Sequence, residues 1–369
     1  MGELRQATTT LEAAGRLAAT AGEPGLAQRV RLRLSYLAVF AEGSSMLEHL
    51  AAAEEAAQVF EALGDDAGLA FALLQQAHMR RDTGQAELGL ALAGRGARLA
   101  AAAGDLAGAR ACRRMAAMCA AVGPTRVPAA LEVCDAADAI ADTGGSSVWD
   151  ARAWLLAQAG RIGEARALYE EAVARLRERG ALLQLRVGMA LAALAERAAG
   201  DLPRAWDLFR GAYALVDADV RGDVSAAAGE LACVLALAGA EVEAARLAEE
   251  ARAFLVPGDV LGGIHWRRAT ALVAARQGRR EDALRLSNEA CALADATDWL
   301  TFRAETHEEA ALVRRHAGDA GAEAEALDAA LALYERKGNR AGAERVRATL
   351  AGSDPWVGPG LRHVAQQSK

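Results

Sequence analysis

The chain has 369 residues, of which 53% are hydrophobic but only 4% aromatic, and its formal net charge is −7. A core with so few aromatic side chains must be built from Ala, Leu and Val, a composition that favours helices over strands. The negative charge argues against nucleic acid as the main partner, because nucleic-acid binding draws on a basic surface.

The sequence indicates a cytoplasmic protein. Its five cysteines are odd in number and scattered among apolar residues, as expected of buried thiols in a reducing compartment. The N-terminus lacks the apolar run of a signal peptide, and no segment approaches the ~18 apolar residues of a membrane span. Only Lys337 and Lys369 among the 42 basic residues are lysines, a bias that suggests an actinobacterial, GC-rich genome.

Glycines recur about every twenty residues and form two alternating sets. The first set, spaced by 37 to 40 residues, is Gly84, Gly123, Gly160, Gly200, Gly239, Gly278 and Gly318. The second set falls between them: Gly64, Gly104, Gly144, Gly180, Gly222, Gly258 and Gly338, with Asp298 in the remaining place. A period of about 39 residues predicts a stacked array in which each repeat holds two helices and the glycines form the turns.

The clearest repeat spans residues 147–180. Apolar residues recur at intervals of three and four on both sides of Gly160, which predicts two amphipathic helices joined at that glycine. Small Ala165 lets the second helix approach the first. The residues that fit the pattern of the tetratricopeptide repeat are Trp149, Gly160, Ala165, Tyr169 and Ala172.

These residues make the chain resemble tetratricopeptide-repeat proteins, which implies an all-α, right-handed α-solenoid. Its period of about 39 residues exceeds the usual repeat of about 34. Longer repeats, with a closing segment such as 326–352, are similar to the C-terminal sensor region of large bacterial transcription activators, among them LuxR-type, maltose-activator and antibiotic-regulatory proteins. We expect the solenoid over residues 1–352 and a disordered tail, rich in Pro and Gly, over 353–369.

No catalytic or metal-binding motif is recognisable. HExxH, GxSxG, GxGxxG and the GxxxxGK[ST] phosphate loop are all missing from the sequence. No helix-turn-helix segment follows Gly352, so the chain is either a free-standing repeat protein or a fragment of a larger regulator. Cys112 and Cys119 could share a helix face, but no His or carboxylate at ligand spacing accompanies them, and we expect them to pack in the core. The sequence predicts no enzyme, no cofactor and no metal.

The resemblance implies that the first helix of each pair lines a concave groove. Counting back six, ten and thirteen residues from each turn glycine places a polar and basic zone in its N-terminal third. The predicted ligand-binding residues of this zone, with their neighbours, are Gln75, His78, Arg110, Arg113, Arg114, Asp150 and Trp154. Guanidinium groups suit carboxylate recognition. The alternatives are that the arginines pair with acidic residues of the adjoining repeat and that Trp154 belongs to the repeat core.

Two further zones follow along the predicted groove. The middle is small and apolar, through Ala190, Ala226, Gly229 and Cys233, which either leaves room for an inserted helix or lets neighbouring helices pack tightly. The C-terminal end is expected to be acidic through Glu305 and Glu308, beside His265 and Arg268.

We therefore expect a non-catalytic binding scaffold. It would be a regulatory module that recognises a peptide, a protein segment or a small effector and is linked to bacterial transcription or signalling, with no contact to nucleic acid or membrane through this region. The alternatives are a constitutive assembly adaptor without effector, or an enzyme built on helical repeats, which would need a convergent cluster of His, Asp, Glu or Tyr.

Overall fold

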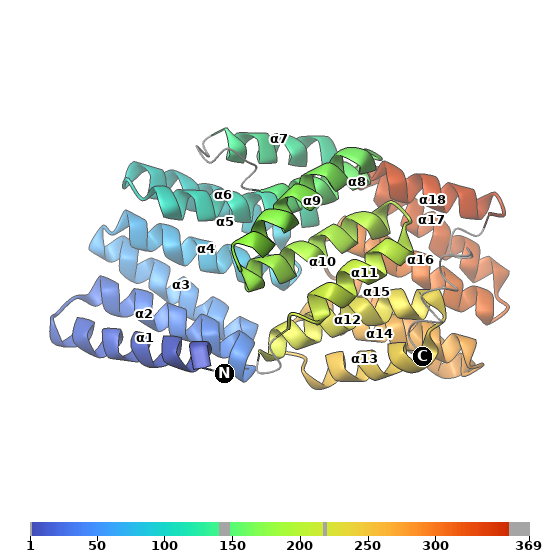
Figure 1. The fold of residues 1–369 in the computed structure, drawn as a ribbon, viewed down its shortest axis with the longest axis horizontal. Helices are drawn as coiled ribbons and strands as arrows, with labels where there is room; N and C mark the ends of the chain where they lie inside the picture. The colour runs from blue at the N-terminus through green and yellow to red at the C-terminus, as the bar shows by residue number, and fades with distance from the viewer. Residues whose placement is uncertain (1, 140–147, 217–219, 354–369) are drawn as a thin grey trace.

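The computed structural model describes residues 2–139, 148–216 and 220–353, and all regular structure in these ranges is helical (Figure 1). Eighteen α-helices occur in these ranges, each packed against the next along the chain, and one π-helical segment directly continues α2. The chain is thus an all-α, tetratricopeptide-like α-solenoid, as the sequence predicted. Of the predicted tail, only Ser353 lies within the described residues, and the division at residue 352 stays a prediction.

The helices of the first part are α1 (Gly2–Thr20), α2 (Pro24–Leu37), η1 (the π-helix Ala38–Glu42), α3 (Met46–Leu63), α4 (Asp66–Asp82), α5 (Ala86–Ala102), α6 (Leu106–Val122), α7 (Val127–Asp138), α8 (Trp149–Gln158) and α9 (Ile162–Glu178). The second part contains α10 (Leu182–Ala198), α11 (Leu202–Tyr213), α12 (Arg221–Ala238), α13 (Glu241–Ala253), α14 (Val260–Arg276), α15 (Arg280–Asp295), α16 (Leu300–His316), α17 (Ala320–Lys337) and α18 (Arg340–Leu350).

Most predicted turn glycines end helices in the left-handed conformation that a side chain disfavours. Several are followed directly by the residue that caps the next helix. At Gly64-Asp65 and Gly104-Asp105, for example, the aspartate accepts a hydrogen bond from the backbone N–H three residues later. The same arrangement occurs at Gly200-Asp201, Gly258-Asp259, Gly318-Asp319 and Gly338-Asn339.

Two of the predicted turn glycines differ from the others, and a third is not tested. Gly123 ends α6 with φ of −76°, outside the left-handed region. Gly222 was predicted as a turn, but this is wrong because it lies in the first turn of α12. There the missing side chain makes room for Phe40 of η1, whose Cδ1 would be 2.8 Å from an added Cβ. Gly144 lies outside the described residues.

The solenoid coils back on itself. Helices α1–α6 stack at the left of Figure 1, α8–α13 continue to the right, and α14–α18 follow on the right-hand side. The inner helices then meet helices of the earlier repeats: α16 contacts α6, α18 contacts α8, and α12 contacts η1. The inner surface from α6 onward is therefore enclosed by the chain itself.

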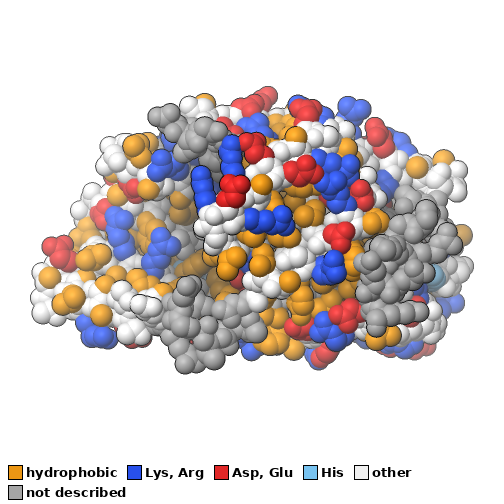
Figure 2. Space-filling view, in the orientation of Figure 1, with side chains coloured by type: hydrophobic (Ala, Val, Ile, Leu, Met, Phe, Trp, Pro, Cys, Tyr) orange, Lys and Arg blue, Asp and Glu red, His pale blue; other side chains and the backbone are white. Residues whose placement is uncertain are grey.

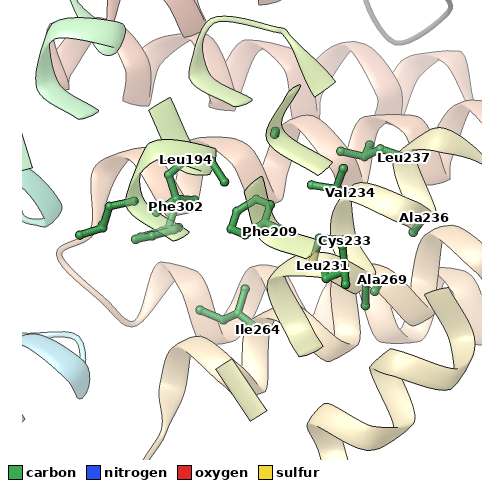
Figure 3. Close-up of a cluster of buried hydrophobic side chains, with 14 of the residues drawn as sticks. Leu194, Phe209, Leu231, Cys233, Val234, Ala236, Leu237, Ile264, Ala269 and Phe302 are labelled. Carbon is green, nitrogen blue, oxygen red and sulfur yellow. The ribbon is translucent and has the colours of Figure 1, made fainter. Parts of the chain in front are cut away.

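Apolar side chains fill the interior of this coil. Figure 3 shows Leu194 of α10, Phe209 of α11, Val234 of α12, Ile264 of α14 and Phe302 of α16, all buried in one cluster. Alanine forms much of the remaining core, which lets the helices pack closely. No helix among the described residues is long and apolar enough to cross a membrane.

The small middle zone of the predicted groove is closed by helix packing. Gly229 and Cys233 of α12 are buried, and an added Cβ on Gly229 would stand 3.0 Å from Cβ of His265 on α14. The Cys233 thiol donates to the carbonyl oxygen of His265 at 3.3 Å. Of the two alternatives for this zone, tight packing of neighbouring helices is observed at Gly229 and Cys233, whereas Ala190 and Ala226 are half-buried.

Three long-range contacts join the first stack to later repeats, and we call this line of contacts the seam. The backbone N–H of Met46 donates to the carbonyl oxygen of Pro257 at 2.9 Å. The turn after α4 meets the α15–α16 loop, where Asp298 N donates to Gly84 O at 3.0 Å. The end of α6 meets Lys337, whose ammonium donates to three backbone carbonyl oxygens.

Candidate functional site

The structure distributes the seven predicted ligand-binding residues over three places. Gln75 and His78 lie on α4, Arg110, Arg113 and Arg114 lie on α6, and Asp150 and Trp154 lie on α8. Whether these residues bind a ligand stays a prediction.

Trp154 is a core residue in this structure. Its side chain is fully buried, and its ring lies 5.6 Å from that of Phe302 on α16. The indole nitrogen has no hydrogen-bond partner among the described residues. The alternative interpretation, in which Trp154 packs in the core, therefore describes the observed contacts.

Asp150 links α8 to the arginines of α6. Its carboxylate is buried, accepts a hydrogen bond from the N–H of Ala151 at 2.9 Å, and forms an ion pair with Arg114. A carboxylate near the start of α8 is also favoured by the helix dipole. For Arg114, the alternative of pairing with an acidic residue of the adjoining repeat is thus observed.

Arg110 and Arg113 differ from Arg114 in their charge partners. Arg110 is exposed and Arg113 half-buried, and neither forms an ion pair with a described residue. Residues three apart lie side by side on a helix. Two guanidinium groups on neighbouring turns of α6 are consequently available to an external acceptor, and we call this pair the α6 arginines.

His78 belongs to a group of rings where α2 and η1 meet α4. The rings of Tyr36 and Phe40 lie 5.4 and 6.3 Å from that of His78. Nε2 of His78 is 3.4 Å from Oδ2 of Asp82, one turn later on α4. Burial, with a smaller effect of Arg81, lowers the pKa of His78 to about 4 despite the opposing Asp82 carboxylate, so the imidazole is neutral at pH 7. We call Tyr36, Phe40, His78 and Asp82 the α4 cluster.

Gln75 lies behind this cluster and is buried. It neighbours His49 of α3, whose Nδ1 is 2.9 Å from Oγ of Ser35. Burial lowers the pKa of His49, against a smaller opposing effect of Gln75. The contact between Ser35 and His49 joins α2 to α3, which is a structural role.

The second half of the chain approaches the α4 cluster through α12 and the loop before α14. Phe40 packs against Gly222, and burial, with smaller effects of the Asp82 and Asp223 carboxylates, raises the pKa of Tyr36 above its usual value. Burial raises the pKa of Asp259 to about 6, although the N–H of Gly262 opposes this by donating to the carboxylate. The α4 cluster therefore lies between two parts of the solenoid.

The predicted acidic end of the groove is wrong, because Glu305 and Glu308 are buried and ion-paired. Both oxygens of Glu308 accept hydrogen bonds from Arg345 of α18, at 2.7 and 2.8 Å. Glu305 lies 3.2 Å from Nη2 of Arg197 on α10. These contacts lock α16 to α10 and α18 and leave no acidic surface there.

Sequence reasoning missed the centre of this ion-pair network, Glu309. Its carboxylate accepts from Arg268 at 2.6 and 2.8 Å and from Arg197 at 2.7 Å. Burial would raise the pKa of Glu309, but Arg268 and Arg197 outweigh it and the pKa is lowered. Neighbouring His265 has a pKa well below its usual value through burial and these arginines. One feature of the sequence could have indicated such a carboxylate. Arg268 was predicted to face inward, and a buried guanidinium group needs an acidic partner.

Within the described ranges, no group of three or more His, Cys, Asp or Glu side chains could hold a metal ion. All five cysteines are buried. Burial raises the pKa of all five thiols, that of Cys112 to about 11. Such thiols are poor nucleophiles at neutral pH.

No protein-family model matches the chain, and no curated protein matches it either. Among solved structures, the chain is similar to a human IFIT1 dimer with PPP-AAAA, with a TM-score of 0.44 and 14% identical residues. The similarity covers 96% of this chain and 88% of that chain.

Proposed function

We propose that the chain is a non-catalytic binding scaffold in which the α6 arginines recognise a carboxylate-bearing peptide or protein segment. The observation that carries this proposal is that Arg110 and Arg113 lack an acidic partner among the described residues, while most other arginines near them are paired. Arg81 and Arg114, for instance, both bind an aspartate.

Charge and geometry support an acidic partner. A guanidinium group offers a fixed fork of donors that matches a carboxylate, and two such groups on adjacent turns can bind two acidic side chains of one segment. The net charge of −7 makes an unpaired basic pair a local exception, so an acidic ligand would be drawn to this part of the surface.

A regulatory role extends this proposal. The long repeats and the closing segment resemble those of the sensor regions of bacterial transcription activators. A module of that kind would convert partner binding into control of transcription or signalling. This step depends on the resemblance, whereas the carboxylate contact depends on the α6 arginines.

A constitutive assembly adaptor is the second candidate. Figure 2 shows hydrophobic side chains gathered at the middle of one face, over α10 to α12, with arginines and carboxylates interspersed around them. Leu182 and Leu183 at the start of α10 are about 60% exposed. Adjacent exposed leucines suit a protein contact.

The test is binding to an array of defined peptides that differ only in carrying Glu, Gln or Lys at two positions three residues apart. Wild-type protein should retain the Glu peptides, and the double variant Arg110→Glu/Arg113→Glu should weaken binding by at least tenfold, because each lost charge-assisted contact costs about 1.5–3 kcal/mol. Arg114 is left intact to keep its pair with Asp150.

The matched control is Arg177→Glu/Arg179→Glu, which makes the same charge change at two exposed positions at the end of α9. Equal weakening in both double variants would mean that net charge alone attracts the peptides. Unchanged binding in the α6 variant would refute the proposed site and favour the apolar face.

A further inference from the structure

A small cavity lies where α14, α15 and α16 pack against one another. Its volume is about 10 Å³, and all the side chains that line it are buried. Four of them are polar, namely Arg268 of α14, Ser287 of α15, and Thr306 and Glu309 of α16, and the others are three alanines and a valine. This is about the space that one water molecule needs.

The cavity lies beside a short side chain at a position where two other repeats carry an aromatic ring. Tyr169 and Phe209 stand nine residues after the glycine that ends the first helix of their repeats, and both are buried. Ser287 stands nine residues after Gly278, and serine has much less volume than tyrosine or phenylalanine. Its hydroxyl group also adds a polar atom to the lining of the cavity.

Arg268 uses two of its three guanidinium nitrogens to bind Glu309. Nε and Nη2 donate to the two carboxylate oxygens, at 2.8 and 2.6 Å. The third nitrogen, Nη1, is buried and has no hydrogen-bond partner within the described ranges. Burying a donor without an acceptor is costly, and more so for a charged group. An acceptor beside Nη1 would therefore stabilise the buried guanidinium group.

Two hydroxyl groups give the cavity acceptors as well as donors. The hydroxyl of Thr306 donates to the carbonyl oxygen of Phe302 at 2.7 Å, so that Oγ1 can still accept a hydrogen bond. The hydroxyl of Ser287 can either donate or accept. An occupant that both accepts from Arg268 and donates to Thr306 would match these groups, and polar cavities of this kind hold ordered water.

Charge and hydrogen-bonding chemistry argue against an ion in this cavity. The guanidinium groups of Arg268 and Arg197 are balanced by the carboxylates of Glu305 and Glu309, so the network attracts neither sign strongly. A cation would meet the N–H groups of Arg268 with the wrong charge. A halide could accept from Arg268 but could not donate to Thr306. A neutral molecule that both donates and accepts is the better match.

We propose that this cavity binds one water molecule, which accepts a hydrogen bond from Nη1 of Arg268 and donates to Oγ1 of Thr306, with Ser287 as its third partner. The water then joins α14, α15 and α16. It also completes the hydrogen bonding of the guanidinium group that pairs with Glu309. This inference concerns the interior of the coil and does not depend on the α6 arginines.

A high-resolution crystal structure of the full chain, grown in the presence of sodium bromide, tests the site without any substitution. We expect a peak of electron density in the cavity, about 2.7–3.2 Å from both Nη1 of Arg268 and Oγ1 of Thr306, with no anomalous signal. A cavity without density would refute the bound water. So would a peak that carries the anomalous signal of bromide, because it would show that the site binds an anion.

Oxygen-17 magnetic relaxation dispersion counts long-lived internal water molecules in solution and gives a second test. Ser287→Thr keeps the hydroxyl group and adds a methyl group in the space of the water, so it should remove one long-lived water per chain. Ala292→Thr places the same β-branched residue at an exposed position of α15 and should leave the count unchanged. Equal counts for the wild type and Ser287→Thr, or an equal loss in both variants, would contradict the proposal. If Ser287→Thr does not fold, the wild-type electron density still decides.

Discussion

Removing the carboxylate of Glu309 should be one of the most damaging single changes in this chain. In Glu309→Gln the side chain keeps its shape but loses its charge, so the guanidinium groups of Arg268 and Arg197 remain buried without their main counter-ion. Breaking a buried ion pair from one side costs about 3–5 kcal/mol. With a total stability of about 5–15 kcal/mol for a folded protein, this is a large fraction.

The assay is urea unfolding followed by circular dichroism at 222 nm, at pH 7. In a thermal melt, the same loss of about 3–5 kcal/mol in the free energy of unfolding would lower the Tm of a cooperative unit of this length by roughly 4–6 °C. Glu289→Gln is the matched control, because Glu289 also contacts two arginines, Arg267 and Arg285, but is 40% exposed. Exposed pairs contribute about 0–1 kcal/mol.

The pH dependence gives a second readout. Because the folded-state pKa of Glu309 is lowered, its contribution to the free energy of unfolding is complete above the usual carboxyl range and is lost as pH falls through the lower folded value. Glu309→Gln should flatten this acid-side loss. A cost below 1 kcal/mol, equal to that of Glu289→Gln, would refute the claim that the network supports the closed coil.

Other predictions concern single side chains. Trp154→Ala should lower the free energy of unfolding by about 3–5 kcal/mol in urea titrations, because it empties a fully buried site; a change below 1 kcal/mol would contradict the core role. Ala165→Trp should overpack α8 against α9, at a cost of about 1–3 kcal/mol or more, and split the denaturation curve, whereas a clean two-state curve would oppose repeat-wise coupling. The folded-state pKa of His78 is about 4, so stability should decrease as pH falls from 6.5 to 4, and His78→Gln should remove that component; an unchanged pH profile would show that His78 is solvated.

Local structure was readable from the sequence because it depends on neighbouring residues. Gly64-Asp65 shows why: the glycine supplies the left-handed turn and the aspartate caps the next helix, and both requirements fall within a few residues. The prediction for Gly222 was wrong because the role of this glycine does not depend on its neighbours in the sequence. A glycine can mark a turn or a close approach, and the Phe40 ring that decides between them comes from far away in the sequence.

The candidate site was harder to predict because it depends on how far the solenoid coils. The resemblance placed Glu305, Glu308 and Trp154 on the inner face, and they do lie on inner helices. An open groove would have left them exposed, but Arg345 of α18 and Arg197 of α10 pair with Glu308 and Glu305. Trp154 packs against Phe302 of α16. Superhelical curvature is the sum of small rotations between repeats, and no short stretch of sequence encodes it.

The seam contacts join pairs of turns that lie a nearly constant number of residues apart in the sequence, and this fixes the number of repeats between them. An open solenoid can lose or gain a helix pair and remain a shorter or longer version of itself, because each repeat needs only its neighbours. Here, deletion of one helix pair between α7 and α14 would carry Asp298 and Lys337 to the wrong junctions, so that the start of α5 and the end of α6 would lose their caps together. The number of helix pairs between α5 and α17 is therefore set by the closure of the coil.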